Sequence, residues 1–275
     1  MVAEASTGPE RTAVADPGSK LIEVSDVGRA FGGVKALDGC CLDVPAGAIV
    51  GLIGPNGSGK TTLFNVITGY ERADKGNVRY KGVDITGTRP DRVFGMGIGR
   101  TFQITRIFAR LTVLENMLIA TQRRELWLRS VLRGAGSVDE HRRALELLAM
   151  VGIAHMKDEP AGHLSFGQRK LLELAYILIA DPEVLLLDEP AGGVNPRLLE
   201  DLGTLIQELN RDGKTVVLVE HNMGFVMSLC DSVSVMQSGR VLVTGRPDEI
   251  RHNELVLHAY LGVDDEDGDA RIEDL

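Results

Sequence analysis

Cysteine and aromatic residues are scarce in this sequence. Its 275 residues include three cysteines and one tryptophan, and aromatic side chains make up 4% of the total. Two of the cysteines, Cys40 and Cys41, are adjacent and therefore poorly placed to bridge each other. This content excludes a disulfide scaffold and favours a reducing compartment. Long hydrophobic runs are also missing, since no stretch approaches the roughly 20 apolar residues of a membrane-spanning helix.

Basic residues are in the minority. Thirty Lys and Arg residues face 39 Asp and Glu residues, for a net charge of −9. This balance argues against a nucleic-acid partner, because phosphate backbones are bound by clusters of Lys and Arg. Part of the acidic excess is local: residues 263–275 hold seven acids and one arginine, which predicts a disordered acidic tail. Residues 1–19 have neither periodicity nor the apolar core of a signal peptide, so we expect a flexible leader.

The rest of the chain, residues 20–262, has the pattern of an α/β domain. Short strands are expected at Leu21–Val27, Gly39–Val44 and Ala48–Ile53. Helical spacing between Thr112 and Val151 then predicts a helical subdomain, over about residues 104–180. Later apolar runs alternate with helical patterns at about 196–211 and 223–230, which indicates a parallel sheet covered on both faces. These runs are Val184–Leu187, Val216–Val219 and Val233–Met236.

A phosphate-binding loop follows the third expected strand. Residues Gly54–Thr61 match the pattern G-x-x-x-x-G-K-[ST] and precede an expected helix at Thr61–Thr68. Glycines let backbone N–H groups converge on phosphate oxygens at a helix N-terminus. Lys60 is suited to the β and γ phosphates, the Thr61 hydroxyl to Mg²⁺ and Thr62 to the α phosphate. The candidate nucleotide-binding residues here are Gly54, Pro55, Asn56, Gly57, Ser58, Gly59, Lys60, Thr61 and Thr62.

Two carboxylates end the apolar run that begins at Val184. Asp188 is suited to orient Mg²⁺, and Glu189 to act as general base on the attacking water, a role worth about 10²- to 10⁴-fold in rate. A pair of acids closing a strand is a weak signal by itself. Combined with the phosphate-binding loop, it predicts hydrolysis of a nucleoside triphosphate.

Five motifs occur together in a characteristic order: Gly54–Thr62, Gln103, Leu164–Gln168, Leu185–Pro190 and His221. Their order and spacing resemble those of the ATP-binding subunits of ABC transporters, over about residues 21–262. The resemblance implies a P-loop NTPase fold with a mainly parallel core sheet, an N-terminal antiparallel β subdomain and a helical subdomain. It also implies ATP and Mg²⁺ as cofactors and a site shared between two subunits.

The resemblance assigns roles to further residues. Ser165 and Gly167, at the start of an expected helix over residues 168–180, would contact the γ phosphate of ATP bound to the other subunit. Phe31 would stack on adenine, Gln103 would contact Mg²⁺ or water, and His221 would contact the γ phosphate. Without this context, a Phe is more often a core residue and a Gln at a strand edge is more often a surface residue. A lone His more often has a structural role.

Two departures from the general pattern indicate a subfamily. Phe166 replaces the usual glycine of Leu-Ser-Gly-Gly-Gln, and Ala191–Pro196 stands where most members have Ser-Ala-Leu-Asp. With several further segments, they resemble the ATPase of branched-chain amino-acid importers. These segments are Phe31–Gly39, Arg100–Leu114, Leu218–Met227 and Ala259–Gly262.

That resemblance implies partners and a location. The partners are a second ATPase subunit, either a non-identical sister or a copy of this chain, membrane permease subunits and, indirectly, a solute-binding protein. The location is the cytoplasmic face of the cell membrane. Three alternatives stay open: the ATPase of a related importer for urea or amides, a soluble ABC ATPase acting in DNA repair or translation, and a regulatory nucleotide-binding subunit without turnover.

Overall fold

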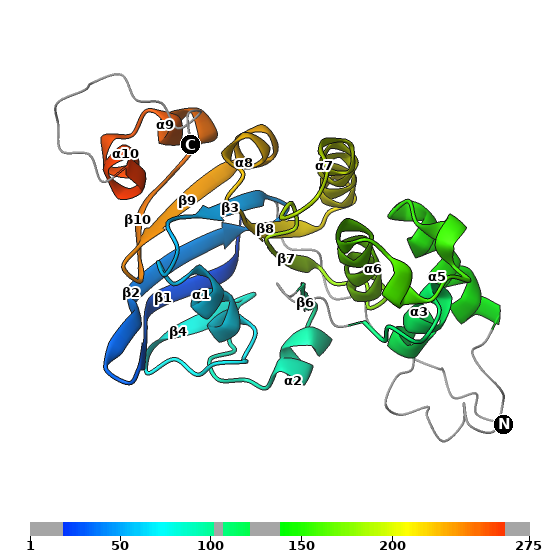
Figure 1. Ribbon diagram of the computed structural model, residues 1–275. Helices are drawn as coiled ribbons and strands as arrows, with labels where there is room; N and C mark the ends of the chain where they lie inside the picture. Colours follow the sequence, from blue (N-terminus) through cyan, green and yellow to red (C-terminus); the bar gives the residue numbers. More distant parts are fainter. Residues whose placement is uncertain (1–18, 102–106, 122–137, 262–275) are drawn as a thin grey trace, which may run out of the picture.

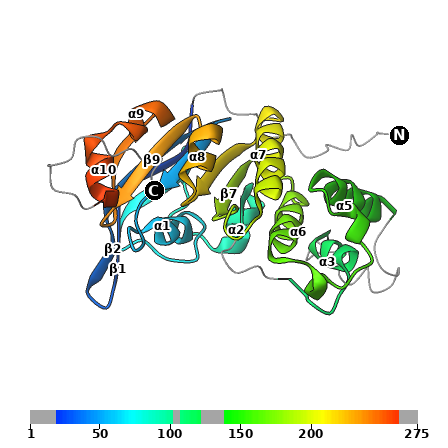
Figure 2. The same ribbon diagram turned by 45° about the horizontal axis from the view of Figure 1, so that its top comes forward.

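The computed structural model describes residues 19–101, 107–121 and 138–261 (Figure 1). These ranges do not include Gln103, the expected acidic tail or nearly all of the expected leader, which ends at residue 19. Two sheets pack together at one end of the molecule, and the helices between residues 107 and 178 lie at the other end (Figures 1 and 2). The expected fold class is confirmed.

The larger sheet has six strands in the order β10-β9-β3-β8-β7-β6. All neighbouring pairs are parallel except β9 and β10, which are antiparallel. Every residue of β3, β7 and β8 is buried, which explains why these strands are unbroken apolar runs in the sequence. The strands are β3 (Ile49–Ile53), β6 (Ile98–Arg100), β7 (Val184–Asp188), β8 (Thr215–Val219), β9 (Ser232–Gln237) and β10 (Arg240–Gly245).

The two faces of this sheet belong to different cores. Leu185 and Leu187 of β7 pack in the core shared with helices α6 (Phe166–Leu178), α7 (Pro196–Arg211) and α8 (Met223–Leu229). Val184 and Leu186, pointing the other way, pack in the core shared with α1 (Lys60–Ile67) and the second sheet. The expected burial on both faces is confirmed.

The second sheet is antiparallel, with the order β2-β1-β4-β5. Its strands are β1 (Lys20–Phe31), β2 (Val34–Pro45), β4 (Lys75–Tyr80) and β5 (Val83–Asp84). β1 and β2 form a hairpin whose turn is made by Gly32 and Gly33, with φ of 52° and 90°. These positive values favour glycine at both positions of the turn.

The helical end of the molecule consists of α3 (Val113–Thr121), α5 (Val138–Met150) and α6, which pack through Met117, Leu147 and Leu148. Helix α6 begins at Phe166, two residues before the predicted start, because Ser165 caps it. Three further helices are α2 (Pro90–Gly95), α9 (Pro247–Arg251) and α10 (Glu254–Leu261). Within the described ranges, no helix has the length and apolar content to cross a membrane.

Candidate nucleotide site

Three neighbouring parallel strands end at one edge of the larger sheet. The loop Gly54–Gly59 follows β3, Asp188 and Glu189 end β7, and His221 follows β8, which lies between the other two. Ligands of open α/β sheets bind outside the carboxyl ends of the strands. The fold therefore brings the phosphate-binding loop to the same edge as two motifs that lie more than 100 residues later in the chain.

The phosphate-binding loop depends on glycine for both shape and packing. Gly54, Gly57 and Gly59 have φ of 149°, 80° and 107°, values that L side chains rarely adopt. A Cβ on Gly54 would also lie 2.1 Å from the carbonyl oxygen of Met236 on β9. Gly59 caps α1 without a side-chain hydrogen bond, so the first N–H groups of this helix are available to an anion.

Lys60 lies inside the loop it follows. Its side chain is buried, and Nζ donates hydrogen bonds to the carbonyl oxygens of Gly54 (2.6 Å) and Pro55 (3.0 Å). Burial lowers the pKa of Lys60, against the charges of Glu189 and Asp188, which raise it. Phosphate oxygens are stronger acceptors than these carbonyls because they are charged.

Asp188 is buried with one oxygen paired and one oxygen unpaired. Oδ2 accepts a hydrogen bond from Arg100 Nη2 at 3.0 Å, whereas Oδ1 is buried without a hydrogen-bond partner. Burial raises the pKa of Asp188, and the hydrogen bond from Arg100 opposes this. A buried, unpartnered carboxylate oxygen beside a phosphate-binding loop fits Mg²⁺, which takes one or two protein oxygens and completes its shell with phosphates and water.

The described residues contain no group of three or more His, Cys, Asp or Glu side chains that could hold a metal ion by themselves. Thr61, the other expected ligand, is exposed on the first turn of α1, and Thr62 beside it is half-buried.

Glu189 and His221 are in direct contact. His221 Nε2 lies 3.1 Å from Glu189 Oε1, and the two side chains are 43% and 26% exposed. Glu189 has φ of +50°, an uncommon conformation for a residue with a side chain, and its N–H donates to the carbonyl of Val219 at 2.9 Å. Strained backbone of this kind is common at functional sites, where surrounding contacts hold it.

Sequence reasoning missed Glu220, the residue before His221. Its buried carboxylate accepts hydrogen bonds from the N–H groups of Ala191 (2.5 Å) and His221 (3.1 Å), so it ties the segment after Glu189 to His221. Burial raises the pKa of Glu220, although these backbone donors oppose the shift. The available signal was an acid placed directly after the apolar run Val216–Val219, where a charge requires partners.

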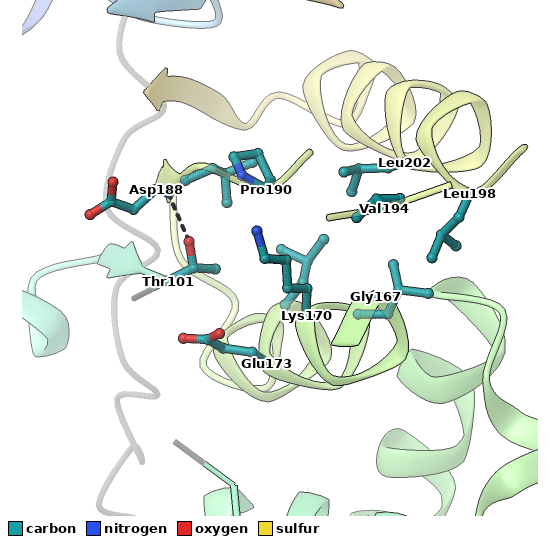
Figure 3. Close-up of a pocket in the computed structure, with 12 residues that line it drawn as sticks. Thr101, Gly167, Lys170, Glu173, Asp188, Pro190, Val194, Leu198 and Leu202 are labelled. Carbon is teal, nitrogen blue, oxygen red and sulfur yellow. Dashed lines mark hydrogen bonds between the residues drawn. The ribbon is translucent and has the colours of Figure 1, made fainter. Parts of the chain in front are cut away.

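Ser165 and Gly167 lie at the start of α6. Ser165 is exposed and forms a capping box: Oγ accepts from Gln168 N–H (3.3 Å), and its own N–H donates to Gln168 Oε1 (2.8 Å). Gly167 is buried, and a Cβ there would lie 2.6 Å from Leu198 Cδ2 of α7. Figure 3 places Gly167 beneath Leu198 and Val194, on the opposite side of the view from Asp188. Gly167 and Asp188 of the same chain therefore line opposite sides of one pocket.

Phe31 ends β1, and the residue is 43% exposed. The guanidinium carbon of Arg29 lies 4.5 Å from the ring centroid, and Arg29 is itself paired with Glu71 and Asp74. One face of the ring is thus supported by a fixed cation. Gln103, the remaining candidate, lies outside the described residues.

Comparison with known proteins gives one consistent family. A family model described as "ABC transporter" matches residues 37–192, and one described as "Branched-chain amino acid ATP-binding cassette transporter" matches residues 240–266. The chain is 38% identical over 250 residues to the high-affinity branched-chain amino acid transport ATP-binding protein BraF of Pseudomonas aeruginosa, covering 88% of this chain and 98% of the relative.

Solved structures agree with these matches. The crystal structure of a nucleotide-free ATP-binding cassette from an ABC transporter superposes with a TM-score of 0.79 at 35% identity, covering 88% of this chain and 98% of the other. A dimeric cassette in a post-hydrolysis state, bound to ADP and Pi, has a TM-score of 0.69 at 28% identity, covering 82% and 98%.

Proposed function

The chain belongs to the family of ABC transporter ATP-binding proteins, and we propose that it hydrolyses ATP to power the import of branched-chain amino acids through a membrane permease. The observation that carries the proposal is the convergence of Lys60, Asp188 and Glu189 at the carboxyl ends of parallel strands, with His221 in contact with Glu189. The solute is proposed from the C-terminal match and from the named relatives.

The loop Gly54–Thr62 holds the triphosphate in this proposal. Its N–H groups and Lys60 bind phosphate oxygens, Thr62 binds the α phosphate, and Phe31 stacks on adenine with its exposed ring. The ammonium of Lys60 exchanges the carbonyls of Gly54 and Pro55 for the β and γ phosphates. Because these carbonyls already hold Lys60 in place, little side-chain freedom is lost on binding.

Mg²⁺, when bound, neutralises charge that develops on the phosphate oxygens. The Thr61 hydroxyl and the Asp188 carboxylate are the residues that would hold it, and the buried, unpartnered Oδ1 supports this. Gln103 is proposed to contact the metal or the attacking water. This proposal depends on the position of Gln103 in the order of motifs.

Glu189 accepts a proton from the water that attacks the γ phosphorus, and ADP leaves. His221 holds the carboxylate through Oε1 and contacts the γ phosphate. The same two residues disfavour a regulatory subunit without turnover.

The complete site is shared between two ATPase subunits. Ser165 and Gly167 contact the γ phosphate held by the other subunit, which is either a non-identical sister or a copy of this chain. The exposed Ser165 hydroxyl at the start of α6 supports this arrangement, as does the dimeric form of one similar cassette. An isolated monomer is then nearly inactive.

Permease subunits dock at an aromatic groove beside Arg100. This groove lies between α2, α3 and α6, and three aromatic residues on its wall, Phe94, Phe108 and Tyr176, are 42%, 52% and 37% exposed. Exposed aromatic side chains that gather in one groove are typical of protein-interaction sites. Docking there places the chain at the cytoplasmic face of the membrane.

Reconstitution in lipid vesicles tests this function. The chain is assembled with its permease, its sister ATPase and the external binding protein, and phosphate release is measured with leucine, isoleucine and valine, or with urea and acetamide. We expect stimulation by the branched-chain amino acids. Stimulation by urea or acetamide alone would assign a related importer, and failure to associate with any permease would favour a soluble ATPase.

A further inference from the structure

The two departures from the family pattern, Phe166 and the segment Ala191–Pro196, lie against each other. A Cβ on Gly193 would lie 3.1 Å from Cδ1 and 3.2 Å from Cε1 of the Phe166 ring, tighter than ordinary van der Waals contact. Gly193 also has φ of 68°, which favours glycine. The bulky residue at the start of α6 is therefore accommodated by a glycine in the segment that follows Glu189.

Lys170, one turn further along α6, joins the same contact. Its Nζ lies 5.0 Å from the centroid of the Phe166 ring and donates a hydrogen bond to the main-chain oxygen of Glu189. The same oxygen accepts a hydrogen bond from the N–H of Gly192 at 3.2 Å. Figure 3 shows Lys170 extending from α6 toward the chain at Pro190.

Lys170 lies among four carboxylates. Burial lowers the pKa of Lys170, and the charges of Glu220, Glu189, Glu173 and Asp188 oppose this shift. The carbonyl that it binds belongs to Glu189, whose φ of +50° needs support from neighbouring contacts. Lys170 supplies such support from a different helix.

We propose that Lys170 is a positioning residue for Glu189, and that Phe166 and Gly193 hold Lys170 in place. Through this cluster, the start of α6 and the turn that carries Glu189 move as one unit. Contact of Ser165 with a nucleotide on the second subunit is thereby transmitted to Glu189 of the same chain. The inference rests on the proposed function, because it requires that Glu189 acts on ATP.

The test is steady-state phosphate release by the full chain, assembled with its ATPase partner, over a range of ATP concentrations. Lys170→Met keeps the length of the side chain but removes the donor, whereas Lys170→Arg keeps a donor. We expect Lys170→Met to lower kcat about 10- to 100-fold, the effect of a small misplacement of a catalytic group. KM for ATP should stay unchanged, and Lys170→Arg should recover most of the loss. Lys157→Met, an exposed lysine in the helical part, is the matched control.

Three results would contradict either the positioning role of Lys170 or the ATP hydrolysis on which it depends. If the wild type does not hydrolyse ATP, the proposed function fails; if it does, and Lys170→Met keeps wild-type kcat, only the positioning role fails. A purely structural role would lower the fraction of chains that bind ATP, whereas we expect full binding stoichiometry. If Lys170→Met does not fold, the same assay is carried out on Phe166→Leu and Gly193→Ala. Wild-type kcat in both of these variants would overturn the proposal.

Discussion

Arg100 and Asp188 form a buried ion pair, with 3.0 Å between Nη2 and Oδ2 and side-chain exposures of 4% and 1%. Nη1 of the same guanidinium donates to Asn65 Oδ1 (2.7 Å) and Thr68 Oγ1 (3.2 Å) on and just after α1. Arg100 thereby connects the helix that follows the phosphate-binding loop to the carboxylate expected at the metal. It also occupies Oδ2, which leaves Oδ1 to face other ligands.

Arg100→Met should strongly destabilise the fold. It leaves Asp188 as a buried carboxylate without its charged partner, a change that typically costs about 3–5 kcal/mol. Urea unfolding of the nucleotide-free chain measures this. Arg89→Met breaks an exposed pair with Asp91 and should cost less than about 1 kcal/mol. Equal losses in the free energy of unfolding would show that the buried Arg100–Asp188 pair stabilises the fold no more than the exposed pair does.

Glu220→Gln should change how stability depends on pH. Burial raises the pKa of Glu220 above its ordinary value of 4.5, so the folded chain binds this proton more tightly than the unfolded chain. The free energy of unfolding of the wild type therefore falls as pH rises from 4.5 through the raised pKa, and the variant lacks this contribution.

The wild type's advantage over Glu220→Gln should consequently be largest at acid pH and shrink as pH rises. At acid pH it reflects the backbone N–H left without an acceptor, worth about 1–3 kcal/mol. Urea unfolding at a series of pH values measures the difference, and Glu208→Gln on α7 controls for the loss of one negative charge. An advantage that grows with pH would contradict the account.

Lys60→Met should weaken ATP binding. Hydrogen bonds to charged groups contribute about 1.5–3 kcal/mol, which corresponds to roughly a 10- to 100-fold rise in Kd. Calorimetric titration with ATP, corrected for the folded fraction, gives the value, and Lys157→Met serves as control. An unchanged Kd would mean that Lys60 keeps its bonds to Gly54 and Pro55 when ATP binds.

Most of the site was predictable because its residues lie in motifs attached to apolar strands. The loop before Lys60, the acids at the end of β7 and His221 after β8 are of this kind. Arg100 and Glu220 are single charged residues, and each has a partner far away in the chain, Asp188 for the first and Ala191 for the second. Only the folded arrangement brings these partners within hydrogen-bonding distance.

Errors in the predicted elements have local causes. The first strand continues to Phe31, beyond the predicted end at Val27, because Asp26 has φ of 49° and an irregularity between Val24 and Val27 disrupts the alternation. β10 was not predicted, since it lies at the edge of its sheet with a half-exposed pattern and no continuous apolar run.

If the chain pairs with a copy of itself, mixing two inactive variants of it should restore activity at a shared site. Glu189→Gln removes the base of a chain's own site, and Ser165→Arg disrupts the contact that the chain makes with its partner's nucleotide. A mixed dimer then contains one intact site, so dimers purified through two different tags should recover about half of the wild-type rate. Mixed dimers that stay inactive would show that Ser165 acts in its own chain.

Hydrolysis by Glu189→Gln tests the central claim most directly. The amide keeps the size of the side chain and removes the general base, so phosphate release should fall about 10²- to 10⁴-fold while ATP binding is retained. Glu200→Gln, at an exposed position on α7, is the matched control and should hydrolyse ATP like the wild type. A Glu189→Gln chain that releases phosphate as fast as the wild type would contradict the account.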